Sequence, residues 1–101
     1  MQTVKLDGSG WTSERDFYDA LASALGSVDW HGRNANAFLE AMIYYLDLNA
    51  MQPPYTVVVE NVSDAMRPFV QDFASWVAEA RQDRMDDPEW GDDVEVSVRT
   101  G

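Results

Sequence analysis

The sequence predicts an α/β fold built on a small parallel sheet. Three stretches have the pattern of strands, at 3–8, 55–62 and 94–100, and helical patterns separate them along the chain. The predicted order is strand, helix, helix, strand, helix, strand, and helical crossovers between strands favour parallel pairing with right-handed connections. The β-branched run TVVV at 56–59 indicates a strand that is buried on both faces, which is typical of a parallel sheet.

The first strand ends in the turn-forming sequence DGSG, and a helix is predicted over 13–26. Ser13 suits the N-cap position, Asp16 stands where a capping box places its acid, and Gly26 supplies the stop. The apolar side chains at helical spacing, which we expect to face the core, are Phe17, Leu21, Ala24 and Leu25.

A second helix is predicted from Asn34, a good N-cap, to about Asn49, where the following QPP ends it. Its expected core face consists of Phe38, Ala41, Met42 and Tyr45. The opposite face, with Leu39 at its flank, consists of Asn36, Glu40, Ile43, Tyr44 and Asp47. A surface that mixes acids with apolar and aromatic groups is more typical of a binding patch than of a solvated helix face.

The third helix is predicted to begin near Pro68, which suits a first helical position, and to end at about Arg84. Its expected core face consists of Phe69, Val70, Phe73, Trp76, Val77 and Ala80. Residues 83–93 carry six acids and are predicted to form an exposed loop. A calcium site is the alternative for this loop, although it lacks the residue order of an EF-hand.

Composition and charge exclude several classes of function. The 101 residues fit one domain, 1–101, and the absence of cysteine excludes disulfides and thiolate chemistry. With 18 acids against 7 bases the formal charge is −11. This charge argues against direct binding to nucleic acid and against binding to an acidic membrane surface. The chain has no long apolar run and no signal-peptide pattern, so we expect a cytoplasmic protein.

The sequence favours a binding protein over an enzyme. Glu40 and Glu79 are possible acid–base partners, yet there is no nucleophile elbow and no phosphate-binding glycine loop. We therefore predict no enzymatic activity and no cofactor. His31 and Arg33 are typical of exposed loop residues, whereas Trp30 either caps an edge of the core or serves as a contact anchor.

The stretch FYDALASALGSVDWHGRNANAFLEAM resembles the barstar family, intracellular inhibitors of secreted bacterial ribonucleases. The resemblance rests on the aromatic pair Trp30-His31, on Gly32 and on Asn34, and the order of elements agrees over the whole chain. It implies a barstar-like three-stranded parallel sheet packed with about three to four helices. It also implies a mechanism in which the second helix and its preceding loop enter the ribonuclease active site.

The resemblance also implies a set of partner-binding residues. They are Trp30, His31, Gly32, Asn34, Asn36, Leu39, Glu40, Ile43, Tyr44, Asp47 and Glu79. Glu40 falls on the family's central acid, while Asn36 replaces an acid and Leu39 an aromatic. These departures point either to a ribonuclease other than the one bound by the type inhibitor or to a weaker complex. The implied partner is a basic secreted ribonuclease, bound one-to-one by a monomer. An immunity protein against another basic nuclease toxin and an acidic protein-binding regulatory module are the alternatives.

Overall fold

The structure, a computed structural model, describes residues 2–28 and 32–100. Its regular elements are β1 (Gln2–Asp7), α1 (Glu14–Leu25), α2 (Ala35–Leu39) with a π-helical turn (Glu40–Tyr44) and a 3-10 turn (Leu46–Leu48), β2 (Tyr55–Glu60), α3 (Arg67–Asp86) and β3 (Val96–Thr100). The predicted order of strands and helices is confirmed. Within the described residues, the helices are too short or too polar to span a lipid bilayer.

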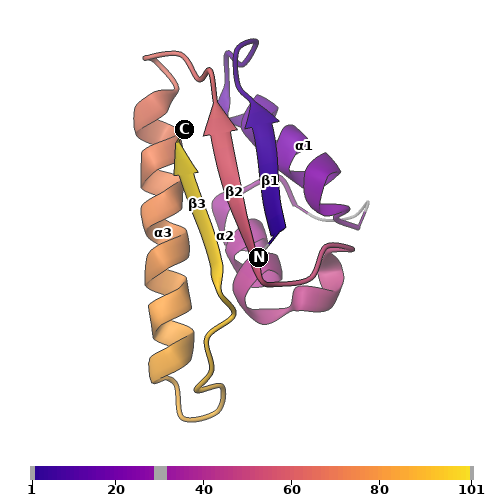
Figure 1. Cartoon of the computed structure of the whole chain (residues 1–101), viewed down its shortest axis with the longest axis vertical. Coiled ribbons are helices and arrows are strands. Elements are labelled where there is room, and N and C mark those ends of the chain that lie inside the picture. The colour runs from indigo at the N-terminus through magenta and orange to yellow at the C-terminus, as the bar shows by residue number, and fades with distance from the viewer. Residues whose placement is uncertain (1, 29–31, 101) are drawn as a thin grey trace.

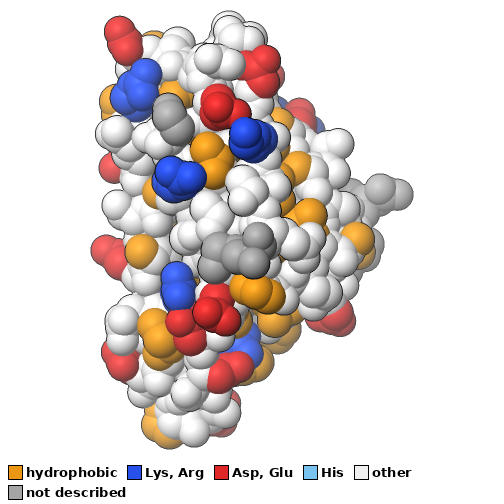
Figure 2. All heavy atoms as spheres, viewed as in Figure 1, with side chains coloured by type: hydrophobic (Ala, Val, Ile, Leu, Met, Phe, Trp, Pro, Cys, Tyr) orange, Lys and Arg blue, Asp and Glu red, His pale blue; other side chains and the backbone are white. Residues whose placement is uncertain are grey.

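The three strands form one parallel sheet in the order β1-β2-β3, as predicted. In register, Val57 of the central strand lies between Val4 of β1 and Val98 of β3. Figure 1 shows α1 and α2 behind the sheet and α3 alongside β3, so no helix of the described residues lies over the front face of the sheet. Basic, acidic and hydrophobic side chains are interspersed on that uncovered side (Figure 2).

The core between the sheet and the helices is rich in aromatic rings. Phe17 packs edge-to-face on Phe73 with ring centroids 5.0 Å apart, and Tyr18 stacks on Phe38 at 5.4 Å. Trp76, which the sequence pattern assigns to this core, is 37% exposed, so that prediction is wrong. It lies at the edge of the apolar stripe of α3, where its ring reaches Phe73 only at a centroid distance of 6.4 Å.

The signals predicted to start and stop α1 act as expected. Asp16 accepts hydrogen bonds from the backbone N–H groups of Thr12 and Ser13 at 2.8 and 3.2 Å, and the pKa of Asp16 is lowered by the bond from Thr12 above all. Gly26 ends the helix with φ +65°, and a Cβ there would lie 2.7 Å from the Cβ of Ala50. A side chain at this position would be both strained and crowded.

The second predicted helix is not continuous. The N–H of Tyr45 donates to the carbonyl of Glu40 at 2.6 Å, which adds one residue to the turn and makes it π-helical. The extra residue rotates the positions that follow, so Ile43 is fully buried and Tyr45 is 55% exposed. The sequence analysis placed Ile43 outside and Tyr45 inside, and both placements are wrong because they assume an uninterrupted α-helical period.

Tertiary contacts stabilise this irregular turn. The side chain of Asn49 donates to the carbonyl of Ala41 at 3.3 Å, and its own amide oxygen accepts from Ser27 at 2.6 Å. The guanidinium of Arg84, from α3, donates to the carbonyl of Ile43. Buried side chains thus supply hydrogen bonds that a continuous helix would make internally, which offsets the cost of leaving those carbonyls unpaired.

The acidic segment 83–93 is only partly a loop, because α3 extends to Asp86. Asp83 and Asp86 therefore lie on the helix, and the connection to β3 begins at Asp87. Among the described residues, Asp, Glu and His side chains form no cluster of three or more suited to a metal ion, which leaves the calcium alternative without support.

Candidate functional site

Asn34 begins α2, and the chain around it is closely packed. Its side-chain oxygen accepts a hydrogen bond from the N–H of Ala37 at 2.9 Å, as an N-cap does. A Cβ on Gly32 would lie 2.9 Å from the side-chain nitrogen Nδ2 of Asn34, so the absence of a side chain at Gly32 allows the loop to approach the N-cap. The predicted contacts Trp30 and His31 lie outside the described residues, and their role stays a prediction.

The cap gives Asn34 a structural role that can be measured. Asn34→Ala should lower the free energy of unfolding by about 0.5–2 kcal/mol, because it removes the hydrogen bond between the Asn34 side chain and the first turn of the helix. Asn34→Asp should retain most of the stability, since a carboxylate accepts the same bond. Urea denaturation of the three proteins checks this, and equal stability of Asn34→Ala and the parent would show that the cap contributes nothing.

Three of the predicted partner-binding residues meet in one groove between α2 and α3. Asn36 and Leu39 line it from α2, and Glu79 lines it from α3. The groove has a volume of about 290 Å³ and is completed by Ala35, Trp76, Ala80 and Asp83. The sequence analysis missed these four residues: it assigned Trp76 and Ala80 to the core and Asp83 to a loop, and it gave Ala35 no role.

The chemistry of the groove suits a basic side chain. Leu39, Ala35 and Ala80 provide apolar surface, and Glu79 and Asp83 stand one helical turn apart on α3. None of the seven described residues that line the groove is basic. A lysine or arginine would therefore find carboxylates for its charged end, apolar contacts for its stem and the ring of Trp76 nearby.

Glu40 follows directly on this groove without lining it. Its side chain is exposed and makes no hydrogen bond with the described residues, whereas its backbone begins the π-turn. Of the two acids considered as an acid–base pair, Glu79 lines the groove and Glu40 does not. Tyr44 closes the turn half-buried, and Asp47 lies exposed in the 3-10 turn that follows.

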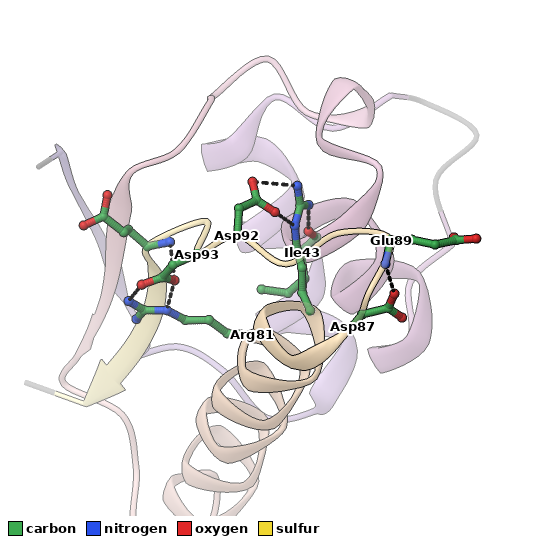
Figure 3. Close-up of polar contacts among 8 residues, drawn as sticks. Ile43, Arg81, Asp87, Glu89, Asp92 and Asp93 are labelled. Atoms are coloured by element: carbon green, nitrogen blue, oxygen red, sulfur yellow. Dashed lines mark hydrogen bonds and ion pairs between the residues drawn. The ribbon is translucent and has the colours of Figure 1, made fainter.

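A buried arginine connects the π-turn with the chain that follows α3. Arg84 is only 7% exposed, and besides the carbonyl of Ile43 it binds both carboxylate oxygens of Asp92, at 2.9 and 3.3 Å (Figure 3). Its guanidinium also lies 4.5 Å from the centre of the Trp90 ring, and that ring meets Tyr44 edge-on at 5.5 Å. The sequence analysis treated Arg84 only as the end of a helix, because nothing local marks an arginine for burial.

The acids of the same connection serve as internal counter-ions. The bonds from Arg84 hold the pKa of Asp92 below its usual value. Arg81 binds Asp93 with two hydrogen bonds of 2.5 and 2.7 Å, which above all lowers the pKa of Asp93 to about 2 (Figure 3). Two of the six acids in 83–93 are therefore paired with arginines of the protein itself and are less available to a partner.

Comparison with known proteins agrees with this arrangement. A comparison with curated proteins gives no match. The model of the family described as "Barstar (barnase inhibitor)" matches residues 1–95, which include every residue of the groove and of the π-turn. With this match over most of its length and with the three-stranded parallel sheet and helices described above, the chain belongs to the barstar family.

Proposed function

We propose that this protein inhibits a small basic ribonuclease by filling its active site with the face formed by α2, the π-turn and the groove against α3. The observation that carries the proposal is the meeting of Asn36 and Leu39 with Glu79 in a groove where the described lining residues include two carboxylates and no basic side chain. Membership of a family described as a barnase inhibitor supports the same class of partner.

The mechanism is occlusion with charge complementarity. A ribonuclease binds the phosphates of RNA with cationic side chains, and carboxylates at matched positions take the place of those phosphates through charge-assisted hydrogen bonds. Glu40 is exposed on this face. Glu79 and Asp83 line the groove, where they would bind a basic side chain from the edge of the active site. The formal charge of −11 attracts a basic enzyme over distance and speeds encounter. No bond is made or broken, so no cofactor is needed.

The proposal is tested by titrating small basic ribonucleases with the protein while RNA cleavage is followed. At least one should lose its activity at an equal molar ratio. For that enzyme, Asp83→Asn should weaken inhibition by about 1.5–3 kcal/mol, the net value of a hydrogen bond to a charged group. Asp72→Asn is the matched control, since Asp72 is also exposed on α3 but does not line the groove.

Two outcomes would count against the proposal. Unchanged cleavage by the whole panel at a large excess of the protein would reject the ribonuclease as partner. Equal losses in Asp83→Asn and Asp72→Asn would mean that overall charge, and not the groove, recognises the enzyme.

A further inference from the structure

The connection between α3 and β3 carries a large exposed aromatic side chain. Trp90 is 40% exposed, although it stands in a short connection with no sequence pattern that requires an indole. An exposed tryptophan beside other aromatic groups is typical of a contact residue in protein interfaces.

This connection is well anchored to the end of α3. The N–H groups of Asp87 and Gly91 both donate to the carbonyl of Arg84, at 3.3 and 3.0 Å. The side chain of Asp92 holds the guanidinium of the same arginine at 2.9 Å, and that guanidinium lies over the Trp90 ring. The Trp90 ring thus packs on the guanidinium of Arg84, whose position is fixed by Asp92, and its other surface is exposed. A side chain that is already ordered loses less conformational entropy on binding.

Trp90 is continuous with the proposed inhibitory face. The helices α2 and α3 run in the same direction where they touch: residues 36 and 39 share the groove with residues 76–83, and residues 43 and 44 meet Arg84 and Trp90. In the chain, Glu40 lies between the groove residue Leu39 and Tyr44, the neighbour of Trp90. The seam between the two helices thus has the groove at one end and the Tyr44–Trp90 pair at the other.

We infer that Trp90 is a contact residue for the target nuclease, so that residues 87–95 form a second wall of the inhibitory face beyond Tyr44. The inference rests on the proposed function and extends it to a segment that the resemblance did not assign. The contact made by Trp90 itself is aromatic, and the neighbouring Asp92 and Asp93 are engaged with Arg84 and Arg81. The matching surface of the nuclease is an apolar or planar group beside its active-site cations.

The test compares the parent, Trp90→Ala and Trp90→Phe in binding kinetics with an inhibited ribonuclease and in thermal unfolding. Trp90→Ala should raise the dissociation constant at least about tenfold, mainly through faster dissociation, and Trp90→Phe should recover part of the loss. A parent that inhibits no ribonuclease rejects the proposed function. A parent that inhibits, with a Trp90→Ala variant that binds equally well, rejects only this inference and assigns Trp90 to covering Arg84.

A second measurement is made on the parent protein, and a variant serves only to assign one resonance. The protein is labelled with 5-fluorotryptophan, and its fluorine resonances are followed as the ribonuclease is added. The Trp90 resonance, assigned through Trp90→Phe, should shift on binding. The resonance of Trp11 should not shift. That ring packs on Phe17 and next to Gly8, after the end of β1, whereas Trp90 precedes β3; in a parallel sheet these positions lie at opposite ends. An unmoved Trp90 resonance in a formed complex would overturn the inference.

Discussion

Replacing Glu40 by alanine should weaken the complex with the target ribonuclease by roughly 2–5 kcal/mol, a general range for buried charge pairs that draws in part on the type complex of this family. The carboxylate is exposed in the free protein and has no partner among the described residues. On binding it would be desolvated against cationic groups of the enzyme, and its removal leaves those cations buried and unpaired. Titration calorimetry with one purified ribonuclease measures the loss.

Two further variants define what Glu40 contributes. Glu40→Gln should lose nearly as much affinity as Glu40→Ala, because the charge matters as well as the shape. Asp47→Ala removes the same charge from an exposed position in the 3-10 turn and should lose much less. None of the three should change the free energy of unfolding by more than about 0.5 kcal/mol, as is usual for surface positions. Glu40 variants that bind like the parent would move the central contact elsewhere on the face.

Replacing Phe73 by alanine should lower the free energy of unfolding by about 3–5 kcal/mol. Phe73 is fully buried and packs on both Phe17 and Tyr18, so its removal leaves a cavity at the centre of the aromatic core. Denaturant unfolding measures this loss, and Trp76→Ala is the control on the same helix. Because Trp76 is partly exposed in the groove, its variant should lose less stability and more affinity. Equal destabilisation by the two variants would place Trp76 in the core after all.

The strands and the ends of α1 were predictable because their signals are local. The alternation in 94–100 and the β-branched run of β2 depend only on which faces are buried, and Ser13, Asp16 and Gly26 act within their own helix. The break in the second helix was not predictable in this way. Its π-turn is stabilised by Arg84 and Asn49, which lie far along the chain or beyond the helix, and a hydrophobic period says nothing about such partners.

The candidate site was also predictable only in part. Asn36, Leu39 and Glu79 were placed together through a resemblance, and the structure brings them into one groove. Ile43 was misplaced by the extra residue of the π-turn, and Trp76 was misplaced because it lies at the boundary of the apolar stripe, where a regular period cannot separate core from groove. Trp90 and Arg84 acquire their roles only through contacts between separate elements.

The central claim is that this face occupies the active site of a ribonuclease, and competition with a nucleotide tests it most directly. The affinity of the protein for the inhibited enzyme is measured at rising concentrations of a nucleoside monophosphate that binds that active site. If the face replaces the phosphates of RNA, the apparent dissociation constant should rise in inverse proportion to the fraction of enzyme that the nucleotide leaves free. An apparent dissociation constant that stays the same at saturating nucleotide, with protein and nucleotide bound to the enzyme together, would contradict it.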